Sequence, residues 1–360
     1  MNIALKKSNK TSVRNGSVSH GAFLLAAALL LASLLLLFAG CNQDGVGIFY
    51  QISQEKAQKE SKISERNVYQ VVEAGGELYA LAGRSVFKQV GGDWSNITGN
   101  HFAYDIVEYS SLLYININDD DTYLDDGTLY SYNGTTLSFE VQYNTDVQLF
   151  EAEDKYILVK GIGDVDHVSS DDDARADPEN ETLVTNFVFD GASGDAGDYL
   201  ISADTLYEGT FGSLDVAVSP PADKSGDYCS LASDGTDIFL TTSSGQVYSS
   251  DGSTWTLEDT ISGREPVAGS LAVVTIDLID YLIIGTEDGY YEWEIGTAEV
   301  VGPTDTASTS DPDEFAAAYP DLTAALVYWV YPSTLEANVF YLGTSNGLWR
   351  RNTDGTFEKL

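Results

Sequence analysis

The chain has 360 residues, enough for one large β domain or two ordinary domains. Hydrophobic residues make up 43% of it and aromatic residues 11%, so the chain can bury a core and global disorder is excluded. The formal net charge of -38 makes nucleic acid a poor partner and favours solubility on an exposed surface outside the cytoplasm, with cation capture as the alternative.

Residues 1–40 have the pattern of a targeting segment. Four basic residues and no acidic one precede an apolar run at 22–38, and small residues follow it at the expected cleavage point. The segment Leu37-Phe38-Ala39-Gly40-Cys41 resembles the lipobox of bacterial lipoproteins, although Phe38 stands where Leu is commonest. The resemblance implies a signal peptide that is cleaved before Cys41.

The same resemblance implies that Cys41 carries a diacylglyceryl group on sulfur and a fatty acid such as palmitate on its new amine. Asn42 rather than Asp follows it, which by resemblance to Gram-negative sorting rules indicates the outer membrane. Residues 41–67 would be the lipidated cysteine and a tether, and 68–360 the folded domain. An uncleaved signal anchor is the alternative, because about 20 apolar residues can span a bilayer.

From residue 68 onward the chain repeats one unit: an apolar strand, a glycine turn, a second apolar strand, another turn and an aromatic residue. Six copies are found, centred on 78–94, 112–137, 156–191, 238–255, 282–291 and 340–349. Asn-Gly and Asp-Gly pairs between strands favour tight hairpins, because they accept positive φ. Gly83 and Gly127 are 44 positions apart, as are Gly245 and Gly289, which matches the ~40–50 residues of a propeller blade.

The repeat predicts an all-β fold, a β-propeller of six four-stranded blades that bury their faces against one another. Trp94, Trp255 and Phe357 are expected to pack between adjacent blades. An acidic segment at 161–181 and a Thr/Ser-rich segment at 303–320 are expected to be surface loops. No stretch of 42–360 combines apolar helical periodicity with capping signals, so the domain is expected to be almost wholly β. Two β-sandwiches are the alternative fold.

The segment 249–255, Ser-Ser-Asp-Gly-Ser-Thr-Trp, resembles the Asp-box of sialidases and other β-propellers, one residue short between Asp and Trp. The resemblance implies a structural role, in which the carboxylate ties the turn and the Trp packs between blades, for Ser249, Asp251, Gly252 and Trp255. It does not extend to sialidase activity, because the arginine cluster is missing and Arg264-Glu265-Pro266 matches the arginine signature at only two of four positions.

No catalytic set can be assembled from the sequence. His101 and His167 are the histidines outside the signal segment, and no Ser/His/Asp, Cys/His or zinc-ligand spacing is found. The protein is therefore predicted not to be an enzyme and to need no cofactor. An oxygen-rich turn contains Asp119, Asp121, Asp125 and Asp126, for which an unliganded turn is the favoured interpretation and a calcium site is the alternative.

Two further features have a structural and a functional interpretation. Cys229 has no disulfide partner if Cys41 is lipidated, and a buried small hydrophobe is favoured over a reactive thiol. Tyr328, Trp329 and Tyr331 are expected on a buried inner strand, and an exposed anchor for a partner is the alternative.

These patterns together predict a monomeric, lipid-anchored β-propeller of the bacterial cell envelope that binds or scaffolds a protein or glycan. One alternative is a glycan hydrolase or lyase, since a pair of carboxylates ~5–10 Å apart at the ring centre would suffice. The other is a cation-dependent adhesin or a structural surface lipoprotein.

Overall fold

The structure is a computed structural model that describes Ile63 and residues 66–360, except for 119–127, 143–146, 153–154, 161–163, 170–178, 183–187, 196, 203–204, 210–215, 220, 298, 305 and 308–310. The chain divides into two compact units, Met1–Val46 and Gly47–Leu360, and the fold below is that of the second. The predicted signal peptide, Cys41 and nearly all of the tether lie outside the described residues, as do Asp119, Asp121, Asp125 and Asp126.

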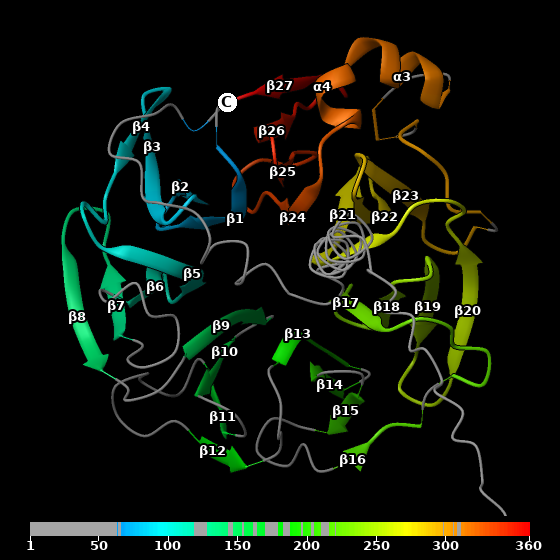
Figure 1. Ribbon diagram of the computed structural model, residues 1–360, viewed down its shortest axis with the longest axis horizontal. Helices are drawn as coiled ribbons and strands as arrows, with labels where there is room; N and C mark the ends of the chain where they lie inside the picture. The colour runs from blue at the N-terminus through cyan, green and yellow to red at the C-terminus, as the bar shows by residue number, and fades with distance from the viewer. Residues whose placement is uncertain are drawn as a thin grey trace, which may run out of the picture. The chain divides into compact units, whose positions relative to one another are not determined.

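The described residues form seven antiparallel sheets, called blades 1 to 7 in chain order (Figure 1). Blade 1 contains β1 (Val68–Ala74), β2 (Glu77–Ala82), β3 (Ser85–Val90) and β4 (Asp93–Asn96). Blade 2 contains β5 (Phe102–Tyr109), β6 (Leu112–Asn118), β7 (Thr128–Tyr132) and β8 (Leu137–Gln142). Blade 3 contains β9 (Val147–Ala152), β10 (Lys155–Lys160), β11 (Asp164–Ser169) and β12 (Glu179–Thr182).

Blade 4 contains β13 (Val188–Gly194), β14 (Gly197–Ser202), β15 (Thr205–Gly209) and β16 (Val216–Ala217). Blade 5 contains β17 (Tyr228–Ser233), β18 (Ile238–Thr242), β19 (Gln246–Ser250) and β20 (Trp255–Thr260). Blade 6 has three strands, β21 (Pro266–Ile276), β22 (Ile279–Thr286) and β23 (Tyr290–Glu294). Blade 7 contains β24 (Val327–Pro332), β25 (Phe340–Thr344), β26 (Gly347–Arg351) and β27 (Phe357–Lys359).

The blades close into a ring through their first strands. Each first strand contacts the first strand of the next blade, in the order β1, β5, β9, β13, β17, β21 and β24, and β24 contacts β1. The predicted β-propeller is therefore confirmed, and six sheets have the expected four strands. The predicted number of six blades was one too low, because the repeat copy at 156–191 combined β10 of blade 3 with β13 of blade 4.

Two segments expected to be loops contain regular structure. The segment 161–181 contributes β11 and most of β12, which complete blade 3. The segment 303–320 contains helix α3 (Pro312–Ala318) and leads into the short helix α4 (Pro320–Thr323). Helix α3 begins at Asp311, whose Oδ1 accepts the N–H of Glu314 at 2.9 Å. The expectation of a loop at 303–320 missed this helix, because seven residues that bury a single side chain, Phe315, are too short to show helical periodicity.

Helix α3 packs onto the outer part of the last two blades. The ring of Phe315 lies 5.4 Å from that of Phe357 on β27 and 5.8 Å from that of Tyr290 on β23. Phe357, an aromatic residue of the repeat, thus bridges blade 7, blade 6 and the helix. Among the described residues, no helix has both the length and the apolar character needed to cross a membrane.

A β-bulge near the start of the first strand recurs in blades 1, 2, 4, 5 and 7. The residue after the bulge bonds through its side chain to the backbone of the next blade. Four of these side chains accept a backbone N–H of the next blade: Gln70 Oε1 accepts that of Ile106 at 2.8 Å, Asp105 that of Leu149, Asp190 Oδ2 that of Leu231 at 2.9 Å, and Ser230 Oγ that of Ser270 at 3.2 Å. In blade 7 the side chain is the donor, because Trp329 Nε1 donates to the Val71 carbonyl of blade 1 at 3.2 Å. These inter-blade bonds fix the inner strands against one another.

Candidate binding site

A cavity of about 550 Å³ lies among the first strands of blades 4 to 7, β13, β17, β21 and β24. Its lining includes residues of the turns that join the first and second strands, among them Asp234 and Gly235 in blade 5 and Thr334 in blade 7. The side of the ring formed by these turns is called the turn face below. The cavity therefore reaches the turn face, where loops from neighbouring blades converge.

The cavity is acidic. Its lining contains Asp190, Asp234 and Asp280 and no Lys, Arg or His. Asp234 and Asp280 are exposed, and each is held by a short hydrogen bond: Asp234 Oδ1 accepts the N–H of Asp237 at 2.7 Å, and Asp280 Oδ1 accepts the hydroxyl of Thr275 at 2.7 Å. Their positions are fixed while their charges face solvent, which favours cationic groups in the cavity.

Asp190 differs from the other two carboxyls because it is buried, with 9% of its surface exposed. Its Oδ1 accepts the N–H of Gly191 at 2.8 Å, and its Oδ2 accepts the N–H of Leu231 in blade 5 at 2.9 Å. Burial raises the pKa of Asp190 to about 7, against the lowering effect of these two bonds. Both oxygens are engaged by backbone, so Asp190 serves as a tie between blades 4 and 5.

Asp105 on β5 is the counterpart of Asp190 in blade 2. It is fully buried, and burial raises its pKa well above the ordinary value, although Asn116 and the N–H of Leu149 donate hydrogen bonds to it. Asp105 is not among the residues that line the cavity. Of the two buried carboxyls, Asp190 lines the cavity and Asp105 does not, and each holds a blade to its neighbour.

The Asp-box-like residues lie at the turn between β19 and β20. Asp251 Oδ1 accepts the N–H of Ser253 at 3.0 Å, Gly252 has φ +85, and the hydroxyl of Ser249 donates to Glu258. Trp255 opens β20, and its ring meets that of Tyr199 in blade 4 edge-on at 5.7 Å. None of the four lines the cavity.

Two other features singled out by the sequence lie on first strands of the blades. Tyr328 and Tyr331 are buried on β24, the inner strand of blade 7, as expected, and Trp329 on the same strand lines the cavity. Cys229 is buried on β17, and burial raises the pKa of its thiol to about 12, so it behaves as a small hydrophobe.

No metal site is visible in the described part of the chain. Within it, no group of three or more His, Cys, Asp or Glu side chains could hold a metal ion. His167 lies on β11, where only the backbone is described. The proposed calcium ligands at 119–126 lie outside the described residues.

The sequence interpretation did not single out the residues of the turn face. Leu278 and Ile279 at the turn of blade 6, and Leu335 in the β24–β25 loop, are exposed aliphatic residues, with exposed fractions of 95%, 41% and 52%. The sequence of the turn could have indicated them, because Asp277-Leu278 occupies the two turn positions where blade 1 has Gly-Gly and blade 2 has Ser-Ser.

Many solved structures match this fold, and the three named below are 12–15% identical to this chain. The extracellular domain of BT3049 from B. thetaiotaomicron matches with a TM-score of 0.58 and 14% identity over 82% of this chain and 40% of that one. PorZ, a surface component of the type-IX secretion system of Porphyromonas gingivalis, matches with a TM-score of 0.54 and 15% identity over 83% and 38% of the two chains. The WD40 domain of Doa1 matches with a TM-score of 0.55 and 12% identity over 84% and 98%.

The fold is a β-propeller. Identities this low establish the fold alone, and the chain spans about two fifths of the length of the BT3049 and PorZ chains. No protein-family model matches the sequence, and no curated protein matches it either.

Proposed function

We propose that this protein is a lipid-anchored β-propeller of the cell envelope that binds or scaffolds a partner protein through its turn face. The observation that carries the proposal is the acidic cavity of about 550 Å³, which the inner strands of blades 4 to 7 hold open at that face. The inter-blade bonds fix these strands, so the site is formed before a partner arrives. A rigid cavity with converging loops is suited to recognition.

A glycan-active enzyme remains the second hypothesis, and the cavity does not favour it. Asp190 is its buried carboxyl, and backbone N–H groups occupy both oxygens of that side chain. A general acid or base must keep an oxygen available to substrate. The Asp-box-like residues Ser249, Asp251, Gly252 and Trp255 take the structural role of tying a turn and contacting the neighbouring blade.

The binding role is tested by site-specific photo-crosslinking in cells that produce the protein. A photoreactive amino acid at Thr236, which is exposed in the turn between β17 and β18, is expected to form an adduct of one defined mass. The same amino acid at Asp93, exposed on the outermost strand of blade 1, is the matched control and is expected to give none. No adduct at Thr236, or equal adducts at both positions, would contradict the proposed binding face.

The anchor is proposed from the lipobox resemblance at 37–41. Cys41→Ser is expected to abolish incorporation of an alkyne-labelled palmitate and to move the protein out of the membrane fraction, because a chain without acyl groups loses about 0.8 kcal/mol of membrane affinity per buried CH₂. Cys229→Ser is the control, since this cysteine is buried and should not be acylated. Full membrane retention of the Cys41 variant would instead identify the apolar run as an uncleaved anchor.

A further inference from the structure

The turn between β21 and β22 in blade 6 departs from the pattern of the equivalent turns. Asp277 and Leu278 have φ values of +52 and +71. This left-handed region is unfavourable by roughly 1 kcal/mol for a residue with a bulky side chain. Blade 1 has Gly75-Gly76 at these two positions, and blade 2 has Ser110-Ser111. Blade 6 therefore places a leucine that is 95% exposed where glycine would suit both the backbone and solubility.

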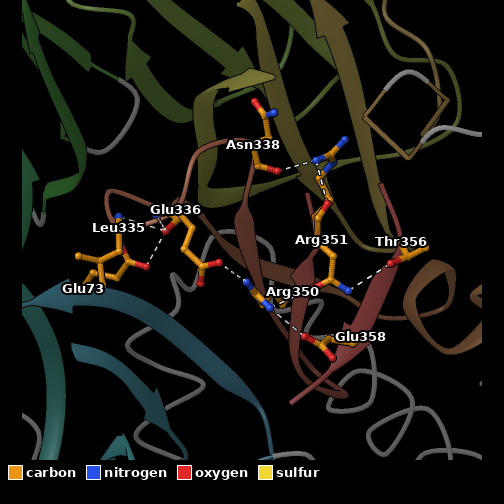
Figure 2. A network of polar contacts seen from close by, with 10 residues as sticks. Glu73, Leu335, Glu336, Asn338, Arg350, Arg351, Thr356 and Glu358 are labelled. Carbon is orange, nitrogen blue, oxygen red and sulfur yellow. Dashed lines mark hydrogen bonds and ion pairs between the residues drawn. The ribbon is translucent and has the colours of Figure 1, made fainter. Parts of the chain in front are cut away.

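Hydrogen bonds hold this turn against blade 7. Asp277 N donates to Asn338 Oδ1 at 2.9 Å, and Asn338 Nδ2 donates to Asp277 Oδ1 at 2.8 Å. Asn338 belongs to the β24–β25 loop, which also carries Leu335. That loop is fixed in turn to blade 1, because Glu73 accepts the N–H of Leu335 at 3.0 Å (Figure 2).

Leu278, Ile279 and Leu335 are called the aliphatic rim. Two loops carry them, and the hydrogen bonds above tie those loops to each other and to the ring. Exposed aliphatic residues scattered over a surface need no explanation. Here they are held on fixed loops beside a cavity, so a partner that contacts them does not have to order them first.

Residues next to the aliphatic rim in the sequence line the acidic cavity. Asp280 follows Ile279 in β22 and lines the cavity, and Thr334, which precedes Leu335, lines it as well. Asp234 lies on the same face in blade 5. An apolar contact surface thus adjoins exposed carboxylates, and the lining offers no basic residue to neutralise them.

We propose that the aliphatic rim and the cavity mouth bind an extended segment of a partner protein in which apolar residues alternate with lysine or arginine. The apolar side chains contact Leu278, Ile279 and Leu335, and the basic side chains reach Asp234 and Asp280. This assignment of the ligand class rests on the proposed function, since it requires a protein partner at the turn face. The carboxylates favour a segment with basic side chains through charge complementarity, and the aliphatic rim favours apolar residues between them.

The test measures binding of a fluorescein-labelled peptide of alternating lysine and leucine to the full-length protein by anisotropy. Two variants probe the site: Leu278→Gly and the double variant Asp234→Asn with Asp280→Asn. Each asparagine keeps the oxygen that accepts the local hydrogen bonds and removes only the charge. Both variants are expected to weaken peptide binding at least tenfold, and a peptide of alternating glutamate and leucine should not bind.

Matched controls separate this site from general effects. Ser111→Gly changes the same turn position in blade 2 without removing an apolar side chain. Asp93→Asn with Asp313→Asn removes two exposed charges at positions that do not line the cavity. Both controls should bind the peptide as the wild type does. Leu278→Gly should melt at an equal or higher temperature than the wild type, because glycine tolerates positive φ, and lost binding then cannot be attributed to misfolding.

Wild-type affinity in Leu278→Gly, or an equal loss in the distant double control, would overturn the proposed ligand class. If the crosslink at Thr236 forms in cells while the peptide fails to distinguish the variants, the binding function stands and the basic, apolar segment is wrong. If no crosslink forms, the binding function itself fails.

Discussion

Raising the pH from 4 to 8 is expected to lower the free energy of unfolding by several kcal/mol. Burial raises the pKa of Asp190 to about 7, from 3.8 for the ordinary side chain. Between these values the folded protein holds a proton on Asp190 that the unfolded chain has released, so the contribution of Asp190 to stability is greatest below pH 3.8 and falls until the pH passes 7. A shift of about three pH units corresponds to about 4 kcal/mol.

Other carboxyls define the limits of this expectation. Burial raises the pKa of Asp105 as well, so it acts in the same direction as Asp190. The exposed Asp251 and Asp354 have a lowered pKa because Ser253 and Thr356 donate hydrogen bonds to them. They stabilise the folded state when ionised, and this stabilisation is lost as the pH falls below 3.8, outside the range from pH 4 to pH 8. Repulsion within a chain of net charge -38 also weakens the fold as carboxyls ionise.

Urea unfolding at several pH values measures the effect, and Asp190→Asn identifies its source. Asparagine cannot ionise, so the decrease between pH 4 and pH 8 should become smaller in this variant, and the part that Asp105 and the general repulsion contribute should remain. Asp93→Asn removes an exposed charge and should leave the slope unchanged. Repeating the titration in 1 M salt screens the general repulsion, since the Debye length falls to about 3 Å. An unchanged slope in Asp190→Asn would show that the buried carboxyl is not responsible.

The fold was predictable because the turns between strands can be recognised from the local sequence of the blades. Gly245, Gly289 and Gly347 have φ values of +84, +81 and +92, and this conformation makes glycine the residue of choice in the sequence pattern. The number of blades was less predictable. Strands β11 and β12 are short and acidic, so their composition resembles a loop, and what makes them strands is pairing within blade 3 rather than their own residues.

The ties between blades could not be predicted from the sequence. Gln70 and Asp190 appear there as polar residues that interrupt apolar strands, but the N–H groups they accept belong to residues 36 and 41 positions further along the chain. The cavity depends on four first strands meeting at one place, which no local pattern reports. Leu278 was visible only as an unsuitable turn residue, and such conflicts between local preference and structure tend to mark functional sites.

Glu73→Ala is expected to lower the free energy of unfolding by about 3 kcal/mol, because Glu73 joins the first blade to the last. Its carboxylate accepts hydrogen bonds from the hydroxyl of Ser333 at 2.7 Å and from the N–H and hydroxyl of Thr334 at 2.6 and 2.9 Å. It also accepts the N–H of Leu335 at 3.0 Å (Figure 2). Its own N–H donates to the hydroxyl of Tyr331 at 3.1 Å.

This is the junction of the ring that no connecting segment of the described chain crosses, because it joins the first blade to the last. Blade 1 is built from β1–β4 and blade 7 from β24–β27, each a continuous part of the chain. Closure therefore relies on contacts such as Glu73, the bond from Trp329 to the Val71 carbonyl, and the rings of Tyr69 and Tyr328 at 4.8 Å. Removing the carboxylate takes away the acceptor of four hydrogen bonds at this junction.

Glu108 provides the matched control for Glu73. Glu108 lies three residues after Asp105, which follows the β-bulge of blade 2, just as Glu73 lies three residues after Gln70 in blade 1. Unlike Glu73, it accepts the N–H of Ser111 within its own blade. Glu108→Ala should therefore cost no more than about 1 kcal/mol. Hydrogen exchange should rise selectively at 68–74 and 327–335 in Glu73→Ala, because opening begins where the ring closes. Equal destabilisation by the two variants, or uniform exchange around the ring, would mean that Glu73 holds a turn and does not close the ring.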